Sequence, residues 1–219
     1  MPTAALPIPA QNFVMRNIPW TTYVAIGDLL LDQNIRMNYD RGVLEFMMTS
    51  PQHEHQKTLL GRLVETLTEE LNVDIASFGS MTFRQEDAER GMEPDECYWI
   101  EHEEQVRGRT TIDFDADPPP DLVVEIEVSR SIVPRLPILA ALRVPEVWCW
   151  DGERVRVLLL TADGSHTESP TSRVFPFLPM TELPRFLADQ GQSETKVVRA
   201  FRAWVREQIA SGAWPKLGA

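Results

Sequence analysis

The segment PPPDLVVEIEVSRS, residues 118–131, combines a strong strand pattern with carboxylates inside an otherwise apolar run. Side chains alternate between the two faces of a strand. One face therefore carries Leu122, Val124, Ile126 and Val128, and the other carries Asp121, Val123, Glu125 and Glu127. Charged side chains are rarely buried unless they are paired or bind a metal. The segment thus predicts a core strand with a functional site on one face.

A second segment, ERGMEPDECYWI at residues 89–100, predicts the partner strand. Asp95 shares a strand face with Cys97 and Trp99. If the two strands pair antiparallel through the long connector, Asp95 lies close to Glu125 and Glu127. Carboxylates this close repel one another unless a cation lies between them. Hard oxygen ligands of this kind suit Mg²⁺ or Mn²⁺.

The same acids have a simpler interpretation. An antiparallel sheet often exposes one face to solvent, and carboxylates on that face pair with arginine or lysine. The convergence of acids from two predicted strands favours the metal site, but the solvated face remains the alternative.

The clearest helix begins at Pro51, with Ser50 as its N-cap. Its apolar stripe, at helical spacing, consists of Leu60, Val64, Leu67 and Leu71. Extended backwards, this stripe reaches Lys57 and His53, so we expect both to line the site. Glu54 and His55 are expected to project to other sides.

His53 also fits a capping residue or a residue that supports the ligands. A zinc site is disfavoured, because His53 and His55 are two residues apart and do not share a helix face.

The remaining pattern indicates one α/β domain over residues 1–219. A lightly ordered arm is expected over 1–18, and helices over 181–219 are expected to pack on the core. Intervening elements are a short helix near 21–33, hairpins turning at DRG and DGE, strands near 73–84 and 95–100, a loop at DAERGMEP, a short helix near 133–142 and an edge strand after 165. The last helix should bury Val198, Phe201 and Val205.

Composition limits the classes of function. The 219 residues carry a formal net charge of -12, which argues against a broad non-specific nucleic-acid surface. The two cysteines, Cys97 and Cys149, indicate no disulfide framework, so a reducing cytoplasm is expected. No signal peptide and no membrane-spanning run is recognisable. A glycine-rich phosphate loop, a G-x-S-x-G elbow and a C-x-x-C pair are also missing from the sequence.

Three motifs together resemble a known family. GMEPDECYWI, PPPDLVVEIEVSRS and LRVPEVWCWDGERVRVLLL are similar to segments of the Uma-type restriction endonucleases, which are assigned to the PD-(D/E)XK nuclease superfamily. The resemblance runs from about Thr21 to Arg206. It implies a restriction-endonuclease-like core: a central mixed β-sheet flanked by helices, with an N-terminal hairpin and C-terminal helices.

The resemblance also implies a metal-dependent endonuclease that hydrolyses DNA phosphodiester bonds. Asp95 matches the aspartate of the PD motif, and Glu125 matches the acid of the E-x-K signature. Both would bind Mg²⁺ or Mn²⁺, together with the backbone carbonyl of Ile126.

The sequence departs from the family pattern at the signature lysine, where it has Glu127. Glu127 would instead assist the metal or the water. Arg135, on the following helix, would contact phosphate, but arginine transfers protons poorly. Leu139 replaces a tyrosine typical of that helix. The alternative is therefore a weakly active or inactive member that acts as a binding or assembly module. Exposed apolar edges would support a homodimer, although nothing in the chain requires one.

Overall fold

The structure, a computed structural model, describes residues 12–30, 35–114, 116–127, 131, 133–188 and 191–215. Its elements, in chain order, are β1 (Asn12–Arg16), α1 (Trp20–Leu29), β2 (Arg36–Asp40), β3 (Val43–Met47), α2 (Pro51–Leu71), β4 (Ala76–Ser77), β5 (Phe83–Gln85), β6 (Arg90–Met92), β7 (Glu96–Trp99), α3 (Glu103–Val106), β8 (Leu122–Ile126), α4 (Arg135–Ala141), β9 (Glu146–Trp150), β10 (Val155–Leu160), β11 (His166–Ser169), η1 (Met180–Glu182), α5 (Pro184–Leu187) and α6 (Glu194–Ala210).

The described strands form two sheets. The large sheet has six strands in the order β11-β10-β9-β8-β7-β4, and the small sheet has five in the order β1-β3-β2-β6-β5. Within the large sheet β8 pairs parallel with β9, whereas β7 pairs antiparallel with β8. The large sheet is therefore mixed, and its helices on both faces confirm the predicted restriction-endonuclease-like architecture.

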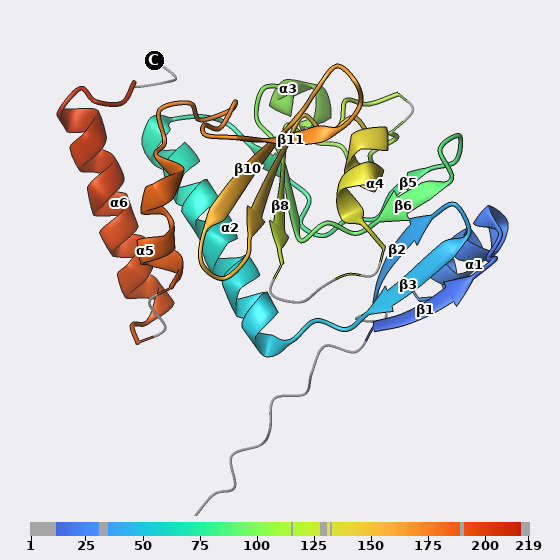
Figure 1. The fold of residues 1–219 in the computed structure, drawn as a ribbon. Helices are drawn as coiled ribbons and strands as arrows, with labels where there is room; N and C mark the ends of the chain where they lie inside the picture. The colour runs from blue at the N-terminus through green and yellow to red at the C-terminus, as the bar shows by residue number, and fades with distance from the viewer. Residues whose placement is uncertain are drawn as a thin grey trace, which may run out of the picture.

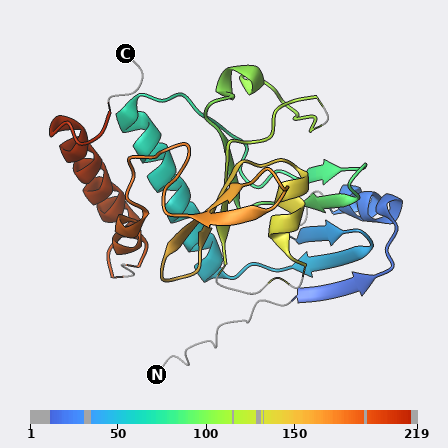
Figure 2. The ribbon, with the colours of Figure 1, turned by 45° about the horizontal axis from the view of Figure 1, so that its top comes forward.

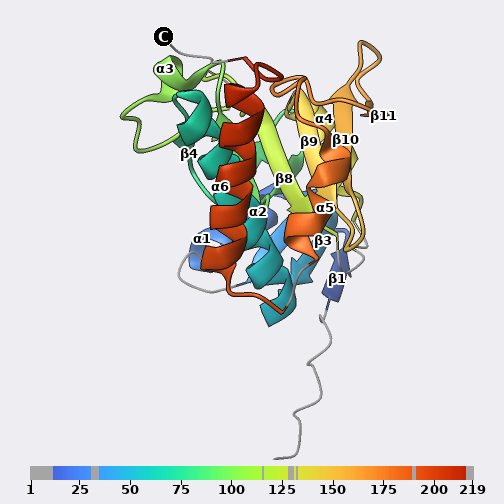
Figure 3. The same cartoon turned by 90° about the vertical axis from the view of Figure 1, so that its left-hand side faces the viewer.

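Helices cover both faces of the large sheet. On one face lies α2, and α5 and α6 pack outside it (Figure 3). Leu122, Val124 and Ile126 of β8 belong to the apolar cluster on this side, as does the predicted stripe of α2. On the other face lies α4, which shares a second cluster with Val123. This confirms the predicted alternation along β8 for the described residues; Val128 lies outside them.

The small sheet lies beside the large one, next to α4, and α1 packs on it (Figures 1 and 2). Its centre is the predicted hairpin of β2 and β3, which turns at Arg41 and Gly42, both with positive φ. Such a turn favours glycine because a side chain crowds the left-handed backbone. The hairpin matters for the site because β2 begins with Arg36.

Two segments differ from the prediction. Residues 12–16, expected in the arm, form β1 and pair with β3 along the edge of the small sheet. The DAERGMEP segment was expected to be a loop, but residues 90–92 form β6 between β2 and β5. Both strands are short and gain their order from pairing with a distant strand, which local sequence does not reveal. The rest of the arm, residues 1–11, lies outside the described residues.

Two further features bear on the sequence predictions. Cys97 and Cys149 are both free thiols in the core, as the absence of a disulfide framework predicted. In the described part of the chain, no helix combines the length and the apolar character needed to cross a bilayer.

A candidate metal site between the two sheets

The register of β7 and β8 brings the two predicted acids together. Glu96 pairs with Val124, so Asp95 comes opposite the end of β8. The backbone N–H of Ile126 donates a hydrogen bond of 2.7 Å to Asp95 Oδ2. Asp95 and Glu125 are both almost fully buried. The predicted convergence of these two residues is therefore present in the structure.

Asp95 also receives a cation from the small sheet. Arg36, at the start of β2, donates from Nη1 to Asp95 Oδ1, across a sequence separation of 59 residues. The second guanidinium nitrogen of Arg36 lies 3.4 Å from Glu54 Oε1. Burial lowers the pKa of Arg36, and the neighbouring Glu54 opposes this shift. Arg36 thus links a strand of one sheet to a helix and an acid of the other.

Glu125 is paired with Arg135, the first residue of α4. Arg135 Nη1 contacts Glu125 Oε2 and lies 3.9 Å from Asp95 Oδ2, so one guanidinium nitrogen lies within salt-bridge distance of both carboxylates. Burial raises the pKa of Glu125 above its usual range, and the charges of Arg135 and Arg36 oppose this shift. Glu125 Oε1 is buried and has no hydrogen-bond partner among the described residues.

His53 reaches the same acids from the first turn of α2. Ser50 caps this helix, as predicted, by accepting a hydrogen bond of 3.2 Å from the backbone N–H of His53. The ring places Nε2 3.2 Å from Asp95 Oδ2, but without hydrogen-bond geometry. Burial and the nearby Arg36 and Arg135 lower the pKa of His53 to about 4. His53 is therefore neutral at physiological pH.

Glu54 does not project away from the site as expected. Its carboxylate lies near Arg36, His53 and Lys57, because the helix begins inside the cleft between the sheets. His55 does project elsewhere and pairs with Glu194 at 3.1 Å. The spacing argument thus held for His55 and was wrong for Glu54.

Lys57 and Glu127 occupy different surroundings. Lys57 Nζ lies 3.7 Å from both Glu54 Oε2 and Glu96 Oε1. Glu127 follows β8 and pairs with Arg156 of β10, on the exposed side of the sheet end. Glu127 therefore lies next to the acid pair in sequence, but an arginine already engages its carboxylate.

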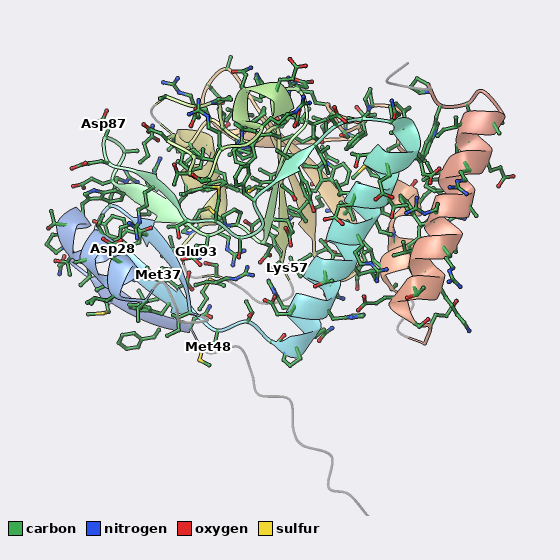
Figure 4. All side chains as sticks on the ribbon, turned by 180° about the vertical axis from the view of Figure 1, so that it is seen from behind. Asp28, Met37, Met48, Lys57, Asp87 and Glu93 are labelled. Atoms are coloured by element: carbon green, nitrogen blue, oxygen red, sulfur yellow. The ribbon has the colours of Figure 1, made fainter. Side chains whose placement is uncertain are left out.

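A polar cavity of about 290 Å³ opens between α1, β2, α2 and the segment before β7. Its lining includes Arg36, Lys57, Arg84, Glu54 and Glu93. Figure 4 labels Lys57 on α2 and, facing it from the other side, Met37 and Glu93. A second cavity, of about 440 Å³, lies at the start of α4 and is lined in part by Glu127 and Arg135.

Arg36 was missed by the sequence reasoning. It belongs to a strand that was recognised only as one arm of a hairpin, and nothing in that hairpin indicates a contact with a residue 59 positions away. The one available signal was its residue type, since an arginine at the start of a largely buried strand needs a partner.

The donor atoms around Asp95 are oxygen and nitrogen atoms of the kinds that bind divalent cations. Asp95 Oδ2 lies beside His53 Nε2, and both His53 Nε2 and Glu125 Oε1 are buried atoms without hydrogen-bond partners in the described part of the chain. Carboxylate oxygens with one imidazole nitrogen are ligands that Mn²⁺ accepts readily and Mg²⁺ accepts mainly through the oxygens. Arg135 Nη1 contacts Glu125 and lies 3.9 Å from Asp95 Oδ2, so a metal ion bound by both carboxylates would have to displace this guanidinium.

A second acidic group is more compact. Among the described residues, the ligand atoms of Glu101, His102 and Asp121 all lie within 4.8 Å of one another. Asp121 is nevertheless fully engaged by protein donors, which include three backbone N–H groups. Proximity of acids alone therefore does not make this group a metal site.

Comparison with known proteins identifies the family. A search of curated proteins finds no match to this chain. The family model Uma2, described as "Putative restriction endonuclease", matches residues 20–193, which is most of the chain and includes every predicted site residue. This match supports a nuclease-like function of the restriction-endonuclease-like superfamily. The chain belongs to the Uma2 family of restriction-endonuclease-like proteins.

Proposed function

We propose that the protein is a Mg²⁺- or Mn²⁺-dependent endonuclease that hydrolyses DNA phosphodiester bonds. The observation that carries the proposal is the convergence of Asp95 and Glu125 on adjacent strands. One guanidinium nitrogen lies near both carboxylates, and Glu125 Oε1 has no hydrogen-bond partner among the described residues. A buried, incompletely satisfied carboxylate is costly, and such groups are retained where function requires them.

The residues that would hold the ion are Asp95, Glu125 and the backbone carbonyl of Ile126, with Glu127 as a further acid. A bound divalent ion lowers the pKa of a water molecule and offsets negative charge on the reacting phosphate. The contribution of Glu127 requires its ion pair with Arg156 to open. Its role as a ligand stays a prediction.

The surrounding side chains orient this centre. Arg36 and the Ile126 N–H fix the two oxygens of Asp95, which leaves the carboxylate little rotational freedom. Arg135 neutralises Glu125 and, once displaced from it, is placed to contact phosphate. His53 and Lys57 line the approach from α2. Three basic residues, Arg36, Lys57 and Arg84, line the cavity together with Glu54 and Glu93, and they are the side chains there that would contact a phosphate.

The test is cleavage of supercoiled plasmid and of single-stranded DNA in Mg²⁺, Mn²⁺ or EDTA. Wild type is compared with Glu125→Ala and with Glu168→Gln, an exposed acid of β11. We expect metal-dependent cutting by wild type and by Glu168→Gln, and a loss of at least about 100-fold in Glu125→Ala, because even residues that only support ligands contribute 10–100-fold. Equal cutting by wild type and Glu125→Ala would contradict the proposal.

A second function, a binding or assembly module without cleavage, is favoured by one observation. Each acid of the centre is already paired with an arginine: Asp95 with Arg36, Glu125 with Arg135, and Glu127 with Arg156. A protein that has replaced its metal by arginines keeps the fold and loses the reaction. Its signature is the absence of cutting in either metal in this assay, together with DNA binding in a gel-shift measurement that EDTA does not change.

A further inference from the structure

The position of the signature lysine is occupied by Glu127, whose carboxylate pairs with Arg156. At a nuclease centre of two acids and a metal, a side chain that donates a proton to the departing oxygen would speed the cleavage. The chain contains three lysines, at positions 57, 196 and 216, and only the first two belong to the described residues. Lys196 lies exposed on α6, whereas Lys57 Nζ lies 3.7 Å from Glu96, the residue that follows Asp95.

Lys57 has a position suited to a reacting group. It lies one helical turn beyond His53, whose ring is 3.2 Å from Asp95. Its ammonium group lines the 290 Å³ cavity together with Arg36, which contacts Asp95 directly. Figure 4 shows the side of the molecule on which Lys57, Met37 and Glu93 face one another across this cavity.

Lys57 is also held loosely. Its two carboxylate neighbours, Glu54 and Glu96, are each 3.7 Å from Nζ, beyond ordinary hydrogen-bond length. The flexible four-carbon stem of lysine allows Nζ to change its position within the cavity without a change in the backbone.

The arginines of the site do not offer the same chemistry. Arg36 is committed to Asp95 and Glu54, and Arg135 to Glu125. A guanidinium remains protonated in proteins and is a poor proton donor, although it can stabilise negative charge. A lysine ammonium is protonated at neutral pH and can release its proton to an alkoxide.

We propose that Lys57, in a chain that has Glu127 at the position of the signature lysine, is the side chain that protonates the leaving group of the cleaved phosphodiester. The oxygen of a water molecule forms a bond to phosphorus, and the bond from phosphorus to one ester oxygen breaks. The departing oxygen takes a proton from Lys57 Nζ. The proton released by the attacking water returns to the lysine amine, so the side chain ends in its starting state. This inference rests on the proposed function.

The experiment compares Lys57→Met and Lys57→Arg with Lys196→Met, the matched control. Single-turnover cleavage in Mn²⁺ and binding of Mn²⁺ by electron paramagnetic resonance are measured for each protein. We expect Lys57→Met to lose 10²–10⁴-fold in rate, the usual contribution of a general acid. Lys57→Arg should recover little of this loss. Mn²⁺ affinity should change less than tenfold in all three variants.

A chemical rescue separates proton donation from a packing role. Lys57→Cys is treated with 2-bromoethylamine, which builds a lysine analogue with sulfur in the side chain. Cys97 and Cys149 are fully buried, so the introduced thiol is the accessible target. We expect aminoethylation to restore at least a tenth of the wild-type rate, whereas a methylating reagent of similar reactivity should restore none.

Three results would overturn the inference in distinguishable ways. If wild type cuts and Lys57→Met cuts equally well, Lys57 is not the proton donor and the proposed function stands. If Lys57→Arg matches wild type, the side chain supplies charge alone. If wild type binds Mn²⁺ but does not cut under any condition, the proposed function fails and this inference fails with it.

Discussion

Strand β8 has a carboxylate cluster at each end, and the two clusters are satisfied in opposite ways. At its start, Asp121 Oδ2 accepts hydrogen bonds from the backbone N–H groups of Ile100, Glu101 and His102, at 2.7, 2.8 and 3.0 Å. Asp121 Oδ1 lies 2.6 Å from His102 Nδ1. This carboxylate stabilises the turn that follows β7, and both of its oxygens accept hydrogen bonds from, or contact, donors of the protein.

At the other end of β8, Asp95 accepts one backbone hydrogen bond, from Ile126, and the charges of Asp95 and Glu125 are balanced by arginine side chains. Side chains of Arg36 and Arg135 balance their charges, and Glu125 Oε1 has no partner among the described residues. Side-chain cations can be exchanged for a metal ion, but backbone N–H groups cannot leave. The compact cluster around Asp121 is therefore structural, and the wider cluster of Asp95 and Glu125 is the candidate site.

The largest effect is expected from Arg135→Gln. Removing one partner of a buried ion pair leaves an uncompensated charge on Glu125, which costs about 3–5 kcal/mol of unfolding free energy. Because a metal ion can take the place of the guanidinium, saturating Mn²⁺ should restore part of this loss. Urea denaturation with and without Mn²⁺ measures both effects.

Arg156→Gln is the control for this prediction, since Arg156 and Glu127 form a more exposed pair. It should cost less than about 1 kcal/mol, as surface ion pairs generally do. Equal losses for the two variants, or a loss in Arg135→Gln that Mn²⁺ leaves unchanged, would show that Arg135 is not a replaceable counter-ion.

A smaller effect is expected at the structural cluster. Asp121→Asn keeps the shape of the side chain but removes the charge that strengthens its hydrogen bonds to the turn, which should cost about 2 kcal/mol. Urea denaturation followed by tryptophan fluorescence measures the loss. Mn²⁺ should stabilise this variant as much as it stabilises wild type. A variant that keeps its stability but loses the response to Mn²⁺ would reverse the assignment of the two clusters.

The smallest effect is expected at His166, which tests whether one buried polar atom without a hydrogen-bond partner is enough to indicate a metal site. His166 on β11 also has a buried nitrogen, Nδ1, without a partner among the described residues, while its Nε2 lies 2.9 Å from the carbonyl of Val144. Burial lowers the pKa of His166, and its contacts with the carbonyls of Val144 and Leu136 oppose this. Among the described residues, the groups that act on the His166 ring are backbone carbonyls and not carboxylates, so we expect a role in stability alone.

The direction in which the unfolding free energy changes with pH follows from where His166 binds its proton. Because the pKa of His166 is lower in the folded chain, the unfolded chain binds a proton there at a higher pH than the folded chain does. The contribution of His166 to stability is therefore full above pH 6.5 and is lost as pH falls. The slope is at most about 1.4 kcal/mol per pH unit. In His166→Gln, unfolding free energy should decline less between pH 7 and 5, with Mn²⁺ binding unchanged. An unchanged pH profile would contradict the assignment.

The acids of the site were predictable because their signal is local. The period-two pattern of β8 fixes which face carries Glu125, and one antiparallel pairing then brings Asp95 beside it. The cap at Ser50 and the stripe of α2 likewise follow from neighbouring residues. These patterns depend on residues within one strand or helix, and the structure confirms the predictions made from them.

The counter-ions were less predictable. Arg36 reaches Asp95 from another sheet, and the position of that sheet depends on tertiary packing that no local pattern encodes. Glu54 was misplaced for the same reason, since its face of α2 appears exposed until the small sheet is set against it. Arg135 was expected at a phosphate, whereas the structure pairs it with Glu125. Sequence thus indicated the negative half of the site more fully than the positive half.

The most direct test of the central claim is a Mn²⁺ titration of wild type, Glu125→Ala and Asp121→Asn by isothermal calorimetry at one pH. We expect wild type and Asp121→Asn to bind Mn²⁺ with the same affinity and Glu125→Ala to bind it at least about 100-fold more weakly, a loss of about 2.7 kcal/mol. If Asp121→Asn loses the ion and Glu125→Ala retains it, the metal site lies at the other end of β8 and not at Asp95 and Glu125.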